Sequence, residues 1–107
     1  MSGLKEALRL VNTRGLAPLT RASLTRPANN AKAEVWLVWG RRQHEVVEAV
    51  TLELEAAGAR VADKGGAVSV NFCGVKASST QGLLQALHNW TAAAEKRLRN
   101  ERGNRHG

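Results

Sequence analysis

The sequence predicts an α+β fold, a two-layer sandwich with the element order α-β-α-β-β-α, in which a small three-stranded sheet carries helices mainly on one face. Three observations support this prediction. The chain has 107 residues, of which 43% are hydrophobic and 23% charged, as is typical of one soluble domain with a modest core. Apolar residues recur at helical spacing in three segments. The segments between them contain the apolar runs and glycine turns that are typical of strands.

The N-terminal region predicts a short amphipathic helix followed by an extended arm. Ser2 is a suitable N-cap, Leu4, Leu8 and Val11 fall on one face, and Gly15 is placed to end the helix. Beyond it, up to residue 33, the helical pattern stops. Two prolines and an Asn-Asn pair in that stretch favour an extended or turning connection.

Residues 34–57 predict a strand followed by a helix. The run EVWLVW, residues 34–39, is apolar at both parities, which indicates a central strand covered on both faces. Gly40 ends this strand, and Gly58 is a natural stop for the helix that follows it. If the strand pairs parallel with the next one, the connection through the helix is right-handed. One apolar stripe of the helix comprises Val46, Val47, Val50, Leu54 and Ala57.

The C-terminal half predicts a β-hairpin and a long helix. Within residues 59–72 a Lys-Gly-Gly turn joins two short strands, and Val68, Val70 and Phe72 alternate toward one face. Ser78 and Gln81 fit a capping box at the start of the last helix, whose basic end complements the helix dipole. Its apolar stripe comprises Leu83, Leu87, Trp90, Ala94 and Leu98.

The net charge of +7 is concentrated at the two ends of the chain. Residues 1–32 carry six bases and one acid, a net charge of +5, and residues 95–107 carry five bases and two acids, a net charge of +3. Between them, five bases and six acids give −1. We divide the chain into a basic N-terminal helix and arm, residues 1–32, an α+β core domain, residues 33–100, and a basic flexible tail, residues 101–107. Because basic surfaces attract polyanions, the ends are the predicted contact surface.

The motifs that would indicate an enzyme or a cofactor site are absent from the sequence. It contains no GxxxxGK[ST] phosphate loop, no GxGxxG that opens a helix and no HExxH. Cys73 is the single cysteine, so a cysteine pair for zinc cannot form, and beside Phe72 in a strand it is expected to be a packed side chain. The three histidines have no spacing that favours a shared metal. We therefore predict no catalytic residues, no cofactor and no metal.

The sequence also predicts a compartment. No run approaches the roughly 18 apolar residues that are typical of a membrane span, and a single cysteine needs no oxidising environment. We therefore expect a cytoplasmic protein without a membrane partner. The alternative is a mitochondrial protein, because residues 1–32 are arginine-rich and acid-poor and open with an amphipathic basic helix, as transit segments do.

The predicted function is non-enzymatic nucleic-acid binding, DNA or RNA, through arginine-rich ends that contact phosphates. The alternative is a small protein-interaction module, such as an inhibitor, adaptor or accessory subunit, that binds an acidic protein surface through the same arginines. Trp36 and Trp39, at opposite parity in the predicted strand, are candidates for stacking or anchoring, and the open sheet would permit a homodimer. The predicted contact residues are Arg14, Arg21, Arg26, Lys32, Arg41, Arg42, Lys96, Arg97, Arg99, Arg102 and Arg105.

Overall fold

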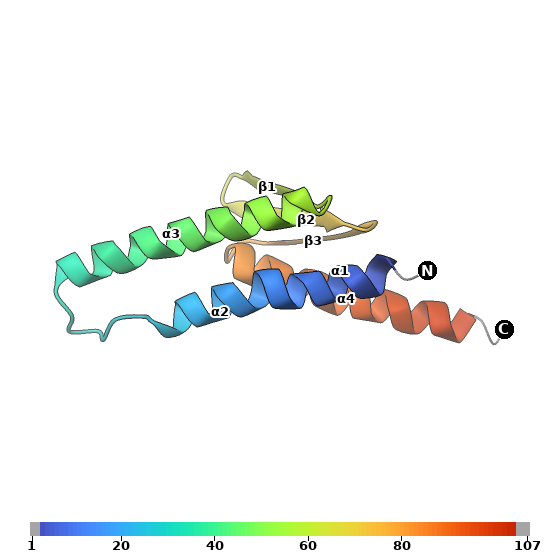
Figure 1. The fold of residues 1–107 in the computed structure, drawn as a ribbon, viewed down its shortest axis with the longest axis horizontal. Coiled ribbons are helices and arrows are strands. Elements are labelled where there is room, and N and C mark those ends of the chain that lie inside the picture. Colours follow the sequence, from blue (N-terminus) through green and yellow to red (C-terminus); the bar gives the residue numbers. More distant parts are fainter. Residues whose placement is uncertain (1–2, 105–107) are drawn as a thin grey trace.

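The computed structural model describes residues 3–104 and shows an elongated molecule, 60 × 23 × 22 Å (Figure 1). Its first helical segment runs without a break through α1, the π-helical η1 and α2, and a linker then leads to the long helix α3. Three strands follow, and α4 ends the described part of the chain. The elements are α1 (Gly3–Leu10), η1 (Val11–Leu16), α2 (Ala17–Leu24), α3 (Ala33–Ala56), β1 (Arg60–Lys64), β2 (Ala67–Phe72), β3 (Val75–Ser79) and α4 (Leu83–Asn104).

The strands form one antiparallel sheet in the order β1-β2-β3. Gly65 and Gly66, with φ of 58° and 83°, make the turn between β1 and β2. Cys73 and Gly74, with φ of 53° and 76°, make the turn between β2 and β3. Two successive left-handed residues match the twist of a tight hairpin, which explains the short connections. The α+β class and the three-stranded sheet are therefore confirmed.

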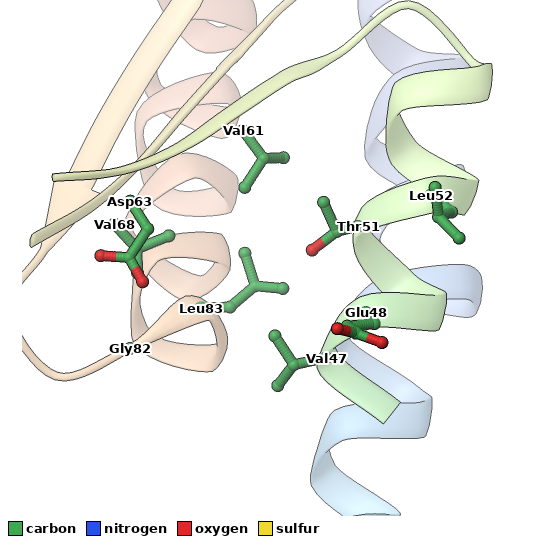
Figure 2. Close-up of a pocket in the computed structure, with 9 residues that line it drawn as sticks. All are labelled: Val47, Glu48, Thr51, Leu52, Val61, Asp63, Val68, Gly82 and Leu83. Carbon is green, nitrogen blue, oxygen red and sulfur yellow. The ribbon is translucent and has the colours of Figure 1, made fainter. Parts of the chain in front are cut away.

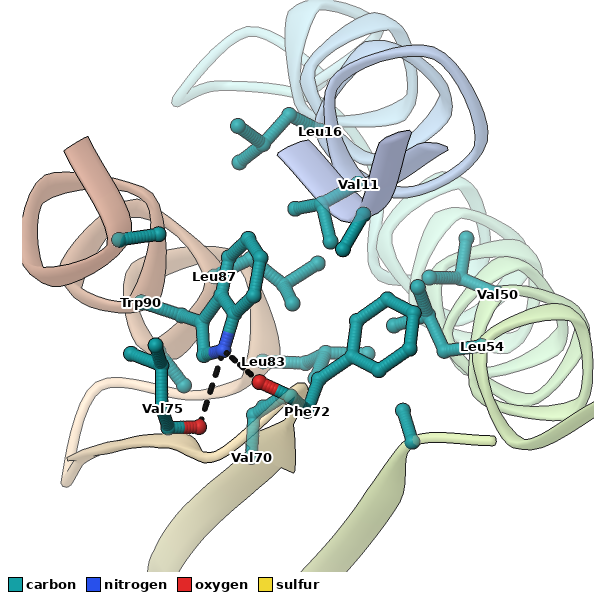
Figure 3. Close-up of a cluster of buried hydrophobic side chains, with 14 of the residues drawn as sticks. Val11, Leu16, Val50, Leu54, Val70, Phe72, Val75, Leu83, Leu87 and Trp90 are labelled. Carbon is teal, nitrogen blue, oxygen red and sulfur yellow. Dashed lines mark hydrogen bonds between the residues drawn. The ribbon is translucent and has the colours of Figure 1, made fainter. Parts of the chain in front are cut away.

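The hydrophobic core lies between the inner face of the sheet and the helices α1, η1, α3 and α4 (Figure 3). The Trp90 indole N–H donates to the carbonyls of Phe72, at 3.3 Å, and Val75, at 3.1 Å. The same indole stacks on the Phe72 ring with a centroid separation of 5.7 Å. These contacts join α4 to the β2-β3 hairpin. The largest fully buried side chains are Trp90, Leu54, Leu87, Val11 and Val70.

Several predicted elements are confirmed. Strands β1 and β2 lie where the hairpin was predicted, with Val70 and Phe72 buried on the inner face. In the last helix the predicted stripe faces the core from Leu83 to Ala94, and Leu98 is half-buried against it. Helix α3 ends just before Gly58, whose φ of 104° is left-handed, as expected of a glycine that follows a helix.

The predicted strand over residues 34–39 is wrong, because these residues are the first turns of α3. Trp36, Trp39 and Gln43 recur at helical spacing and are half-buried, and they extend the predicted stripe toward the N-terminus of the helix. The third strand is instead β3, which pairs antiparallel with β2, so the condition of a parallel pairing, on which the right-handed connection depended, is not met in the described sheet. The predicted element order is only roughly compatible with the observed one.

The predicted extended arm is wrong for residues 17–24, which form α2. The helix passes through Gly15, and Pro18 is tolerated in the first turn of α2, where a missing N–H costs little. Ser2, the predicted N-cap, lies outside the described residues. Residues 3–19 are part of the core, to which they contribute Leu4, Ala7, Val11, Leu16 and Leu19.

Three smaller predictions also need correction. Cys73 is an exposed turn residue and not a packed strand residue. Ser78 lies in β3, and it is the Ser79 hydroxyl that accepts the Gln81 backbone N–H, at 2.9 Å. Residues 101–104 of the predicted flexible tail are helical, and residues 105–107 lie outside the described part. Among the described helices, none combines the length and apolarity that crossing a membrane requires.

Candidate functional site: the distal hairpin

The end of α2 and the first turns of α3 project beyond the sheet and α4 as an antiparallel helical hairpin (Figure 1). We call residues 20–43 the distal hairpin. None of its side chains is buried. Its two helices are joined where the Gln43 side-chain amide donates to the Ala22 carbonyl at 2.9 Å, and the Thr25 hydroxyl caps α2 by donating to the same carbonyl at 2.6 Å. The hairpin is thus a protruding element that adds no buried side chain to the core.

The charge of the distal hairpin is strongly positive. Its five bases against one acid, Glu34, give a net charge of +4. All five bases are exposed. In the described part of the chain, none of them forms an ion pair. The hairpin therefore offers uncompensated charge to an anionic partner. The five bases are Arg21, Arg26, Lys32, Arg41 and Arg42.

Both predicted aromatic anchors lie in the distal hairpin, on the same side of α3 and not on opposite faces of a strand. The Trp36 and Trp39 rings meet edge to face with centroids 5.8 Å apart. The Arg26 guanidinium lies 5.5 Å from the Trp36 ring centroid, a cation–π distance that orients this arginine at the tip. The Trp39 indole N–H is shielded from solvent and has no acceptor within residues 3–104. Both rings are half-buried, so they pack within the hairpin and expose only part of their surface to solvent.

The distal hairpin also exposes large aliphatic side chains, which sequence reasoning missed. Leu24 is 79% exposed, Leu37 71%, Val38 55% and Val35 49%. Val35 and Val38 line a groove of about 430 Å³ between the linker and α3. The strand prediction hid this feature, because a central strand would have buried these residues on both faces. The helical spacing of the two tryptophans was the signal that could have revealed it.

The remaining predicted contact residues lie outside the distal hairpin. Arg14 forms an exposed ion pair with Glu53 of α3, at 3.6 Å. Arg97 donates to the Gly74 carbonyl at 3.0 Å and so supports the β2-β3 turn. Lys96 and Arg99 are exposed on α4, which runs away from the distal hairpin (Figure 1). Arg102 lies in the last turns of α4, and Arg105 lies outside the described residues. The structure therefore separates the described bases of α4 from those of the distal hairpin.

A second hollow, of about 560 Å³, lies between α3 and the sheet (Figure 2). Val47 and Thr51 of α3 line one wall, and Val61 of β1 lines the other. Its two carboxylates, Glu48 and Asp63, come from opposite walls. An apolar hollow with two acids does not suit phosphate, so it is not part of the basic surface. Within residues 3–104 no group of three or more His, Cys, Asp or Glu side chains could hold a metal ion.

Comparison of the chain with protein-family models, with curated proteins and with solved structures finds no match.

Proposed function

We propose that this is a non-enzymatic nucleic-acid-binding protein that contacts phosphates through its distal hairpin. The observation that carries the proposal is the net charge of +4 on a protruding hairpin whose five bases are all exposed and free of ion pairs among the described residues. Four of the five are arginines, whose planar guanidinium groups form paired hydrogen bonds with phosphate. Neutralising phosphates releases counterions, which favours binding at low salt.

The test is a titration of labelled duplex DNA, single-stranded DNA and structured RNA between about 50 and 200 mM salt. The variant Arg41→Ala/Arg42→Ala removes two exposed bases from the hairpin, and Lys5→Ala/Arg9→Ala removes two exposed bases from α1 as a matched control. We expect affinity to fall steeply with salt. We expect the hairpin variant to lower the salt slope by about two, since each phosphate contact on duplex DNA contributes about 0.9.

The control variant should bind like the unmodified protein, because α1 is packed against α4 and does not belong to the distal hairpin. Equal losses in both variants would mean that net charge alone governs binding. The absence of binding to all three nucleic acids at low salt would contradict the proposed function.

A second candidate function, binding to an acidic protein surface, is favoured by the exposed aliphatic side chains of the same hairpin. Apolar patches on a protein surface mark protein interfaces, whereas nucleic-acid interfaces are more polar. The variant Leu24→Ser/Leu37→Ser removes two of these side chains and keeps all five bases. If a protein is the partner, this variant should lose binding to that purified partner. If nucleic acid is the only partner, the variant should bind nucleic acid with the same affinity as the unmodified protein.

A further inference from the structure

The outer face of the sheet, which points away from the core, is a further basic surface. Strand alternation places Val61, Val70 and Phe72 on the inner face, so their neighbours along each strand point outward. The strand register then aligns Arg60 of β1, Asn71 of β2 and Lys76 of β3 in one row across the sheet. The outward residues are Arg60, Ala62, Lys64, Ala67, Ser69, Asn71, Lys76 and Ser78.

This face is open and carries only positive charge. Its three bases, Arg60, Lys64 and Lys76, are exposed, and none of its eight residues is an acid. Asn71, in the middle strand, is exposed between Arg60 and Lys76. Within the described residues, none of these four side chains has a hydrogen bond or an ion pair. Polar groups that the fold leaves without partners are available to a ligand.

The shape of the face favours a duplex over a single strand. The next row across the sheet consists of Ala62, Ser69 and Ser78, which are all small, so no large side chain stands at the centre of this face. The face has no aromatic side chain on which an unpaired base could stack. The major groove of B-form DNA admits a β-ribbon, whereas that of A-form RNA is too narrow for side chains to read.

We propose that the outer sheet face binds duplex DNA, with Arg60, Lys64 and Lys76 on phosphates and Asn71 directed toward base edges. Asparagine is one of the side chains that can pair with an adenine edge, and Asn71 is exposed in the central strand between Arg60 and Lys76. This surface was not among the predicted contact residues. It deepens the proposed function, on which it rests, by naming the nucleic acid and a second contact surface.

The test uses an isosteric charge change. Asn71→Asp keeps the shape of the side chain and places a carboxylate in the centre of the row, where it should repel phosphates. Asn12→Asp adds the same charge on the exposed surface of η1 and is the matched control. We expect Asn71→Asp to weaken binding of duplex DNA about tenfold, and we expect Asn12→Asp to weaken it much less.

A second variant, Arg60→Thr/Lys76→Thr, removes both outer bases of the row while threonine preserves strand propensity. It should lower the salt slope for duplex DNA by about two, as measured beside the Lys5→Ala/Arg9→Ala control. Far-UV circular dichroism and thermal unfolding establish that each variant is folded.

The outcomes separate this inference from the proposed function. If both sheet variants bind duplex DNA like their controls, the sheet surface is overturned, whatever the hairpin variant does. If the sheet variants lose affinity and the hairpin variant does not, the sheet surface stands and the hairpin assignment fails. Tighter binding of single strands or RNA than of duplex DNA, or binding only to an acidic protein, would overturn the choice of duplex DNA.

Discussion

The two ends of α3 contrast within one helix. At its C-terminal end, Val50 and Leu54 are buried beside Gly15 of η1, in a core that also holds Trp90. At its N-terminal end, the 24 residues of the distal hairpin contain no buried side chain. At one end, α3 is therefore fixed by hydrophobic burial. At the other end, it is held to α2 by one interhelical hydrogen bond and by half-buried tryptophans. Segments with little burial have low local stability, and binding elements are drawn from such segments.

The largest effect that this contrast predicts comes from deletion. Removing residues 1–24 takes out Leu4, Val11, Leu16 and Leu19 of the core, each worth about 1.5–3 kcal/mol when buried. Their sum is comparable to the whole stability of a typical domain, about 5–15 kcal/mol. We expect the deleted chain to show no cooperative thermal unfolding by circular dichroism.

The matched change replaces residues 23–40 with a short Gly-Ser loop, which removes most of the distal hairpin and none of the buried side chains. That variant should unfold cooperatively. A cooperative transition in the first variant, or its loss in the second, would show that the division between core and hairpin is drawn in the wrong place.

An intermediate effect is expected from the tryptophans. Trp90→Phe removes an N–H that donates to two carbonyls and leaves a gap in a fully buried site, so it should cost on the order of 2 kcal/mol. Trp39→Phe removes an N–H that has no acceptor within the described residues, so it should change the free energy of unfolding by less than about 0.5 kcal/mol. Urea titrations measure both values. A loss of similar size at the two positions would mean that Trp39 is part of the cooperative core.

The buried end of the molecule could be predicted from the sequence, and the exposed end could not. The stripe from Leu83 to Ala94 has one interpretation, because its spacing fits a helix and its length exceeds that of most strands. The run over residues 35–39 is apolar at every position, so these five residues fit a strand as well as a helix. The spacing of Trp36 and Trp39 favours the helix, but it is the lack of a strand paired with this run in the described structure, a tertiary fact, that decides between the two. Strand β3 was missed because VKASS has two apolar residues and adjoins a serine that fits a helix cap.

The candidate site shows the same limit. The sequence predicted that basic residues gather in the first 32 positions and the last 13, and charge can be counted without a structure. It could not show that Arg97 is engaged by the β2-β3 turn, or that Arg41 and Arg42 share a protruding hairpin with Arg26. The outer sheet row of Arg60, Asn71 and Lys76 joins three strands and depends on their register. A row of that kind appears only when the pairing is known.

The smallest predicted effect comes from substitutions of two helical glycines, one in the buried core and one in the exposed distal hairpin. A Cβ at Gly15 would lie 2.9 Å from Leu87 Cδ1, in the fully buried centre of the core, and overpacking of this kind costs about 1–3 kcal/mol. A Cβ at Gly40 would meet nothing within 4 Å, so alanine there gains helix propensity of about 0.5–1 kcal/mol. Gly15→Ala should therefore lower the midpoint of thermal unfolding and Gly40→Ala should raise it slightly. Alanine gains the same helix propensity at Gly15, and this gain offsets part of the overpacking cost. The midpoint of thermal unfolding therefore falls for Gly15→Ala only if the Leu87 side chain cannot move away from the added Cβ. A higher unfolding midpoint for both variants would mean that the core around η1 accommodates a methyl group as easily as the exposed surface at Gly40 does.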